Sequence, residues 1–202
     1  MEASTWDRIE RSRERWDVLR HPFYRRWSAG ELTADDLARY SGQYRHAVTA
    51  IAELSEDAAA ALPERPELDE HADEERGHVA LWDGFLQAAG GDATDAPTPE
   101  TAECVRAWTA PGEVDEALVR LYAIESGQPA ISRTKRTGLV DRYGYADGEA
   151  TAYFREHSTR DVEHAAEVRA LIEEVAAESD EDRLVAAAEA AFRANWRLLD
   201  GV

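Results

Sequence analysis

The spacing of apolar residues along the chain predicts a protein built from α-helices. Apolar positions recur every three or four residues over most of the sequence, and no stretch alternates apolar and polar residues for long enough to predict a strand. The pattern predicts about seven helices, at residues 5–19, 33–62, 66–89, a short segment around Cys104, 113–137, 149–178 and 180–199. We therefore expect an all-α bundle that forms a single domain over residues 1–202.

Residues that begin and end helices mark several of these boundaries. Gly30 is expected to end a short helical segment, and Thr33 with Asp36 has the pattern of a capping box at the start of the next helix. The sequence PERPE stops that helix, and Gly90 with Gly91 ends the following one. Most helices are thus joined by short connections, and the longest loop is DATDAPTPE.

The charge of the chain excludes several classes of partner. Acidic residues number 42 against 23 basic ones, for a formal net charge of −19. A surface of this sign repels phosphate backbones and anionic lipid, so neither nucleic acid nor a membrane is expected as a partner. Apolar runs are too short to span a bilayer, and the N-terminal sequence MEASTWDRIERSRERW is too charged for a signal peptide, so we expect a cytoplasmic protein.

The chain has one cysteine and one lysine, and both facts bear on its chemistry. Cys104 is the only cysteine, so no disulfide forms within the chain, and a metal site must use oxygen and nitrogen ligands. Lys135 is the only lysine, and every other basic residue is an arginine. Together with the many carboxylates, this usage suggests a GC-rich genome and a halophilic, high-salt cytoplasm.

Ionisable residues interrupt the apolar face of the helix expected at residues 149–178. Its core-facing row, at steps of three or four, consists of Phe154, His157, Asp161, His164, Val168 and Leu171. Burial of unpartnered polar groups costs on the order of 2–7 kcal/mol each, so these side chains need compensation. A bound metal ion would supply it. The alternatives are a buried hydrogen-bonded network, or a helix rotated so that the three side chains face water.

Two further predicted helices show the same anomaly. On residues 66–89, His71, Glu75 and His78 share a face with apolar residues, and Glu74 lies beside them. Glu75 and His78 form a Glu-x-x-His pair, the spacing that binds metal in carboxylate-bridged di-iron bundles. On residues 113–137, Glu125 is the polar member of an apolar row, where an edge position or a salt bridge would be the ordinary explanation.

Taken together, these rows offer the ligands of a dinuclear site. The candidate ligands are the carboxylates Glu74, Glu75, Glu125 and Asp161 and the imidazoles His78, His157 and His164. Carboxylates can bridge two divalent metals while imidazoles bind at the ends. We therefore predict two metal ions, Fe/Fe or Mn/Fe.

The chain resembles a known superfamily at several of these positions. The stretches HPFYRRWSAGELTADDLARY, DEERGHVALWDGF, YAIESGQPAISRTKRTGLVDRYGY and YFREHSTRDVEHAAEVRALI resemble heme-oxygenase-like proteins, which include thiaminase II and pyrroloquinoline quinone synthesis proteins. They resemble in particular the dinuclear metal-oxidase branch that contains p-aminobenzoate synthases. The resemblance covers nearly the whole chain. It implies a heme-oxygenase-like bundle and an O2-dependent oxidoreductase that takes electrons from an external reductant.

The resemblance also implies roles for individual residues. The metal ligands would be Glu74 or Glu75 with His78, Glu125, and the set His157, Asp161 and His164, while His71 would be a spare ligand or a hydrogen-bond partner. The aromatic ring of p-aminobenzoate would come from Tyr24, and its amine from Lys135. Tyr40 matches a second tyrosine associated with the site. Such a protein would consume its own side chains in one turnover and would serve folate biosynthesis.

Lys135 must be brought back toward the metals for this chemistry. It follows Glu125 by ten residues, about 15 Å along an ideal helix, so either its side chain reaches back or the helix bends near Pro129. An arginine could not replace it as a nitrogen donor.

Other functions remain open from the sequence alone. The same metals could oxidise an external amino acid or fatty acid and leave Tyr24 intact. A thiaminase II-like hydrolase would need a nucleophilic cysteine where this chain has Glu125, and Cys104 lies before that helix. A non-enzymatic interaction protein would bind no metal. By analogy with such bundles, we expect a homodimer.

Overall fold

The computed structural model describes residues 4–158, 160–176 and 179–202, and in the segment 159–163 it describes no side chain. The described residues form helices and no strand, as the apolar spacing predicts. The helices are α1 (Thr5–Arg15), α2 (Pro22–Ala29), α3 (Ala34–Ala61), α4 (Pro66–Ala89), α5 (Pro99–Trp108), α6 (Val114–Glu125), α7 (Gln128–Asp141), α8 (Ala152–His157), α9 (Arg160–Val175) and α10 (Glu181–Asp200), with 3-10 turns η1 (Val18–Arg20) and η2 (Glu149–Thr151).

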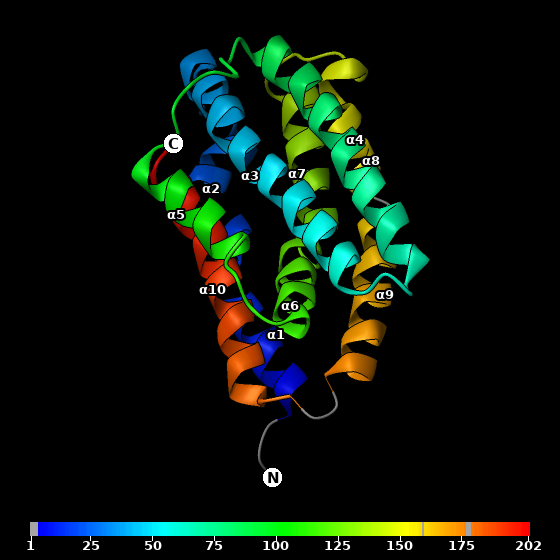
Figure 1. The fold of residues 1–202 in the computed structure, drawn as a ribbon. Helices are drawn as coiled ribbons and strands as arrows, with labels where there is room; N and C mark the ends of the chain where they lie inside the picture. Colours follow the sequence, from blue (N-terminus) through cyan, green and yellow to red (C-terminus); the bar gives the residue numbers. More distant parts are fainter. Residues whose placement is uncertain (1–3, 159, 177–178) are drawn as a thin grey trace.

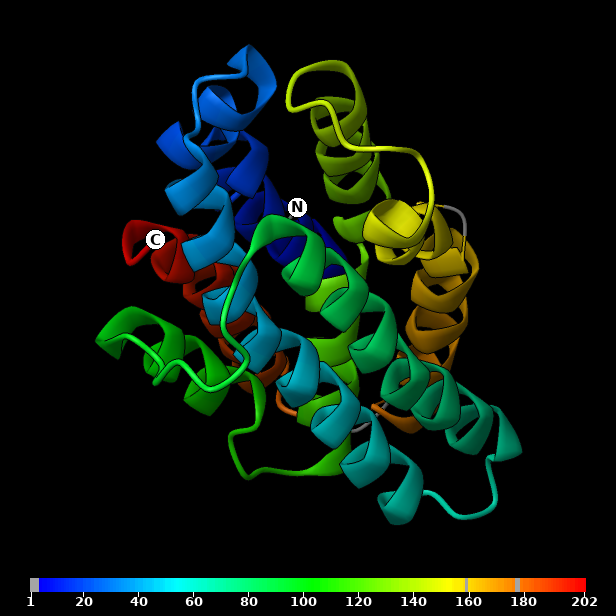
Figure 2. The ribbon, with the colours of Figure 1, turned by 90° about the horizontal axis from the view of Figure 1, so that it is seen from above.

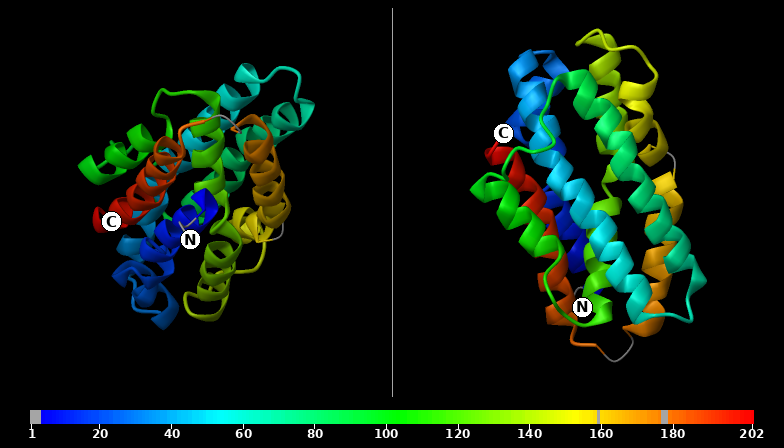
Figure 3. Two further views of the ribbon diagram at one scale, coloured as in Figure 1. Left: turned by 90° about the horizontal axis from the view of Figure 1, so that it is seen from below. Right: turned by 45° about the horizontal axis from the view of Figure 1, so that its top comes forward.

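The helices pack into one bundle around α3 and α4. These two helices lie side by side along most of their length, with α6 and α7 behind them (Figure 1; Figure 3, right). α9 packs on α6 and α8 packs on α7, while α10 packs on the other side of α6 and α5 packs on α10 and α3 (Figure 2). No helix within the described part of the chain is long and apolar enough to cross a membrane.

The predicted helix boundaries are confirmed where a specific residue sets them. Thr33 and Asp36 form the expected capping box, because each side chain bonds the backbone N–H of the other residue, at 3.1 and 2.8 Å. Gly30 and Gly90 end α2 and α4 with φ of 74° and 75°, the left-handed conformation that glycine adopts without strain.

Two of the predicted helices are each divided, and both divisions lie at the site. The helix expected at residues 113–137 breaks between α6 and α7, because Pro129 has no N–H to bond the carbonyl of Glu125. Of the two alternatives, the bend near Pro129 is therefore confirmed. The helix expected at residues 149–178 is divided into η2, α8 and α9, with α8 ending at His157.

Candidate metal centre and a buried lysine

α4 places three side chains of types that can bind metal on the face that it turns toward the core. His71, Glu75 and His78 follow one another at intervals of four and three residues, so they share one face of the helix. All three are buried, and Glu75 is only 1% exposed. Glu75 Oε1 is hydrogen-bonded to Nδ1 of His78 at 3.0 Å.

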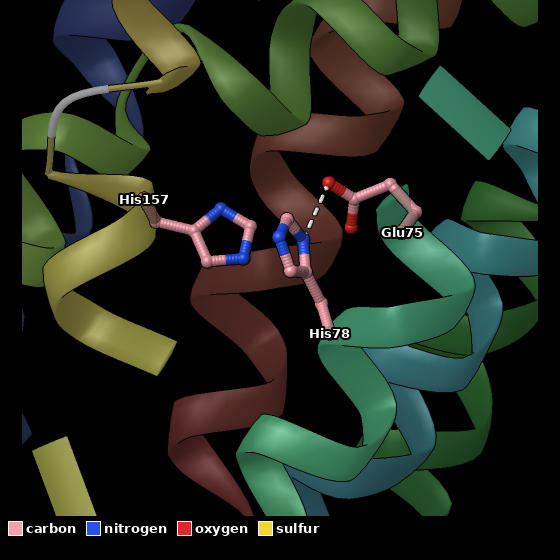
Figure 4. A group of neighbouring side chains, drawn as sticks. All are labelled: Glu75, His78 and His157. Atoms are coloured by element: carbon pink, nitrogen blue, oxygen red, sulfur yellow. Dashed lines mark hydrogen bonds and ion pairs between the residues drawn. The ribbon is translucent and has the colours of Figure 1, made fainter. Parts of the chain in front are cut away.

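α6 and α8 add one carboxylate and one imidazole to this face. Glu125, the last residue of α6, lies with an Oε1 atom 2.8 Å from Nε2 of His71. His157, the last residue of α8, packs its ring against His78 with the ring centroids 4.4 Å apart (Figure 4). The two helix breaks described above thus place a ligand residue at each new helix end. We call these five buried residues, His71, Glu75, His78, Glu125 and His157, the donor cluster.

The donor cluster divides into two overlapping groups with the spacing of metal ligands. One group is Glu75, His78 and His157, and the other is His71, Glu75 and Glu125; within each, one donor atom per residue lies within 4.8 Å of the others. Glu75 belongs to both groups. A carboxylate with two oxygen atoms can bridge two cations, so this arrangement fits two neighbouring metal ions.

The electrostatics of Glu75 agree with a cation-binding role. Burial alone would raise the pKa of this carboxyl, but the hydrogen bond with His78 and the nearby imidazoles of His157, His78 and His71 lower it to about 2. Glu75 is therefore ionised, and its Oε2 atom is buried with no hydrogen-bond partner among the described residues. Such an atom is expected to have a partner of another kind, and a metal ion would be one. The buried histidines and glutamates thus fit a metal site.

Glu74, His164 and Asp161 complete the set of ligands predicted from the sequence. Nε2 of His164 lies 3.2 Å from Oε2 of Glu74, and the His164 ring packs 4.8 Å from the ring of His71. The Glu74 side chain is 32% exposed, whereas Glu75 lies inside both groups. Asp161 falls in the segment 159–163, outside the described side chains.

Lys135 on α7 is enclosed by aromatic rings. Its side chain is 0% exposed. Its Nζ atom lies 4.3 Å from the ring centroid of Tyr44, 5.3 Å from Trp82, 5.4 Å from Tyr40 and Phe154, and 5.9 Å from Tyr24. We call these five rings the lysine cage. Nζ has no hydrogen-bond partner among the described residues.

The backbone around Lys135 is held close to α2. Nε1 of Trp27 donates to the Lys135 carbonyl at 3.3 Å. This approach requires Gly138, because a Cβ atom there would lie 2.4 Å from Nε1 of Trp27. The close contact of Trp27 with Gly138 therefore determines how deeply this turn of α7 lies in the bundle.

Burial sets the protonation of the groups in the lysine cage. It lowers the pKa of Lys135 well below its usual value, which favours the neutral amine, the nucleophilic form. Burial also raises the pKa values of Tyr24 and Tyr40 well above 10, so both phenols keep their protons. Their hydroxyl oxygens lie 3.2 Å apart, within hydrogen-bond distance. The structure thus brings together Tyr24, Tyr40 and Lys135, the three residues to which the resemblance gives roles; those roles stay predictions.

A series of packed rings connects the lysine cage to the donor cluster. The ring of Tyr40 lies 6.0 Å from that of Trp82, Trp82 lies 4.9 Å from Tyr153, and Tyr153 lies 4.1 Å from His157. Trp82 and Tyr153 are both 0% exposed. The two sites are therefore separated by aromatic side chains.

Several residues of these sites were not predicted from the sequence. Tyr44, Trp82 and Phe154 in the lysine cage, and Tyr153 beside His157, carry no signal of chemistry by themselves. Helical spacing could have found two of them, because Tyr44 follows Tyr40 by four residues and Trp82 follows His78 by four. His71, expected as a spare ligand or hydrogen-bond partner, lies in one of the two ligand groups.

Comparison with known proteins relates these sites to a family. A family model described as iron-containing redox enzyme matches residues 42–196. A 4-aminobenzoate synthase of Chlamydia muridarum is 31% identical over an alignment of 201 positions. The alignment covers 91% of this chain and 83% of that protein. A 4-aminobenzoate synthase of Nitrosomonas europaea is 31% identical over an alignment of 209 positions. The alignment covers 92% of this chain and 85% of that protein.

The fold has a solved counterpart, and the family follows from these matches. A domain of unknown function with a heme oxygenase-like fold from Shewanella denitrificans superposes with a TM-score of 0.81 at 21% identity, covering 100% of this chain and 92% of that one. The predicted heme-oxygenase-like fold is thereby confirmed. The chain belongs to the heme-oxygenase-like family of iron-containing redox enzymes.

Proposed function

We propose that this protein is an O2-dependent, self-sacrificing 4-aminobenzoate synthase. Its curated relatives of that name support this function, and so does the content of the lysine cage. 4-Aminobenzoate is an aromatic ring that carries one amine nitrogen. The cage holds a phenol ring, Tyr24, and a neutral primary amine, Lys135, in the same water-free space. This juxtaposition is the observation that carries the proposal.

The metal centre would be held by the donor cluster. Glu75 would lie between two ions, with His78 and His157 on one and His71 and Glu125 on the other. His164, Glu74 and Asp161 are proposed to complete the ligand set. Bound as Fe/Fe or Mn/Fe, the ions would supply the oxidising chemistry, with O2 and an external reductant as co-substrates. The surrounding residues keep bulk water away, because every member of the donor cluster is buried.

The ring series gives the oxidation of Tyr24 a physical route. Trp82 and Tyr153 lie between His157 and Tyr40, so packed rings link Tyr24, which lies beside Tyr40, to the residues that would hold the metal ions. When Tyr24 loses an electron its phenol becomes strongly acidic. The hydroxyl of Tyr40, 3.2 Å away, is placed to accept a hydrogen bond from the Tyr24 hydroxyl and so to orient it.

Lys135 then acts as the nitrogen source. Its amine has no carboxylate partner among the described residues and is held neutral by burial, so its lone pair is available to the oxidised ring. An arginine in the same position would remain protonated at any accessible pH. Formation of the bond from Nζ to the ring would require that the Nζ–Cε bond of Lys135 and the ring carbon–oxygen bond and Cα–Cβ bond of Tyr24 break, with O2 as the oxidant and the external reductant as the electron source. The reaction would therefore consume both side chains, and each chain would produce at most one molecule of product.

The test is to react the protein once and find what it has lost. Apoprotein is loaded with Fe(II), or with Mn(II) and Fe(II), supplied with reductant and exposed to O2. We expect 4-aminobenzoate at no more than one molecule per chain and a matching loss of intact Tyr24 and Lys135 peptides by mass spectrometry. Tyr24→Phe should form no product, whereas the control Tyr145→Phe, a tyrosine outside the cage, should react normally.

Other outcomes of this experiment would identify other functions. Product released with Tyr24 intact, or turnover of an added amino acid or fatty acid, would replace self-sacrifice with an oxidase acting on an external substrate. A protein that binds no metal would be an interaction protein. A thiaminase II-like hydrolase is disfavoured because burial raises the pKa of the Cys104 thiol well above 9, which makes it a weak nucleophile. The homodimer, the cytoplasmic location and the high-salt habitat stay predictions.

A further inference from the structure

A pocket opens from the surface toward the donor cluster, between the first turns of α4 and the second half of α9. Its volume is about 320 Å³. The two helices lie beside each other at this end of the bundle (Figures 1 and 2). Its walls include Leu68 from α4 and Val168 and Leu171 from α9, all of them apolar.

The inner end of this pocket is formed by two imidazoles. His71 and His164 both line it, and their rings pack 4.8 Å apart. His71 belongs to the donor cluster, with Nε2 2.8 Å from Glu125, and His164 lies 3.2 Å from Glu74. The pocket therefore leads from solvent to the edge of the proposed metal centre.

The outer rim of the pocket is acidic. Glu67, Glu167 and Glu174 line it and are exposed, whereas Arg65 is the one basic residue among the residues that line it. Arg65 is already paired with Glu174 and lies 3.8 Å from Glu67. The rim thus carries more negative than positive charge, in a chain with a formal net charge of −19. A concave surface of this sign raises the local concentration of cations.

The opposite side of the donor cluster is closed. Tyr153 packs on His157, and Trp82 packs on Tyr153; both side chains are 0% exposed. Beyond them lies the lysine cage, whose aromatic rings enclose a fully buried amine and, among the described residues, leave no open path from solvent on this side. A metal ion is therefore not expected to arrive from that side.

We propose that the pocket between α4 and α9 is the route by which divalent metal ions reach the donor cluster, with His164 and His71 at its inner end as the first protein ligands that an incoming ion meets. The inference rests on the proposed metal centre. The acidic rim collects hydrated cations, and the apolar walls offer no donor that would retain them there. An ion then gains ligands only by moving inward, first to His164 and His71 and then to the donors in the interior.

The test follows uptake of Co(II) by the metal-free protein in the absence of O2. Co(II) is a divalent ion with visible absorption bands, so stopped-flow absorbance gives the rate of binding, and titration gives the number of ions bound. Leu171→Trp places a larger side chain in the pocket and should slow uptake severalfold without changing the number of ions bound. Leu171→Ala widens the pocket and should not slow uptake.

The rim is tested separately, with variants that leave the core untouched. Glu167→Lys reverses one exposed charge at the rim and should slow uptake at low salt, with the difference from the wild type shrinking as salt is added. The matched control, Glu103→Lys, reverses an exposed charge on α5 and should change the rate much less.

The outcomes separate this route from the metal centre itself. If the wild type binds Co(II) but neither Leu171→Trp nor Glu167→Lys slows uptake, the pocket is not the route. If Glu103→Lys slows uptake as much as Glu167→Lys, the net charge of the chain, not the rim, governs the rate, and the rim has no special role. If the wild type binds no Co(II) at equilibrium, the metal centre fails, and the route fails with it.

Discussion

The donor cluster and the lysine cage are both buried, and both contain ionisable groups. They differ in that the donor cluster favours the charged form of Glu75, whereas the lysine cage favours the neutral form of Lys135. In the donor cluster, the carboxylates of Glu75 and Glu125 lie within hydrogen-bond distance of imidazoles, and Glu75 stays ionised. In the lysine cage, Lys135 is surrounded by aromatic rings, and burial favours its neutral form. A buried carboxylate that is hydrogen-bonded to an imidazole keeps its charge, whereas a buried amine enclosed by aromatic rings loses it.

This difference matches the chemistry proposed for each site. Ionised carboxylates and neutral imidazoles are metal ligands, while a neutral amine is a nucleophile. Placing both sites in one bundle requires that they stay apart, since a free amine could itself bind a metal. The rings of Trp82 and Tyr153 lie between them and provide that separation.

The largest expected effect comes from removing the carboxylate that the two ligand groups share. Glu75→Ala should weaken metal binding on the order of 100-fold or more, because it removes a ligand from both groups. Glu74→Ala is the matched control on the neighbouring residue and should have a smaller effect, because Glu74 is partly exposed and lies outside both groups. Titration with Co(II) measures the metal affinity of both variants. Equal losses for the two variants would mean that Glu75 does not bridge.

A second prediction concerns the suppressed charge of the lysine cage. Lys135→Met keeps the volume and removes the amine, and at pH 7 it should raise the free energy of unfolding by on the order of 1–3 kcal/mol, because it removes a buried polar group whose Nζ has no hydrogen-bond partner among the described residues. Product formation should be lost. Urea unfolding of both proteins measures the difference.

The pH dependence of that difference has a definite sign. The pKa of Lys135 is lower in the folded chain than in the unfolded chain, so the unfolded state binds more protons between the two pKa values. The stability of the wild type therefore rises with pH up to about 10.4, the unperturbed value for lysine. The advantage of Lys135→Met should be largest below the folded-state pKa and should shrink toward pH 10. A constant difference would show that the amine is charged in the folded protein.

The smallest expected effect comes from the hydroxyl of Tyr40. Tyr40→Phe keeps the ring in the lysine cage but removes the oxygen that lies 3.2 Å from the Tyr24 hydroxyl. Loss of one buried hydrogen bond should cost about 0.5–1.5 kcal/mol in stability. If the Tyr40 hydroxyl orients the Tyr24 phenol through this hydrogen bond, the variant should also form product more slowly while binding metal normally. An unchanged rate would show that the hydrogen bond has no part in the reaction.

Local sequence patterns predicted most of the helices and much of the candidate site. Helix-stop residues and apolar spacing are local, so α3, α4 and α10 lie within about one residue of the expected ranges. The donors on α4 were found because they interrupt an apolar row. The choice between Glu74 and Glu75 stayed open, because adjacent residues on a helix differ by about 100° in direction and spacing alone does not say which one faces the neighbouring helices.

What the amino-acid sequence determined by itself was the all-α fold, the rows of ionisable residues on apolar faces, and the single lysine. Only the tertiary structure decided that Glu75 belongs to both ligand groups, that His71 faces Glu125, and that Lys135 lies among rings from four helices, α2, α3, α4 and α8. The physical reason is that sequence patterns are local, whereas the site is built from residues far apart in the chain. Helical periodicity places a side chain on a face of its own helix, but the packing of distant helices determines which other side chains it meets.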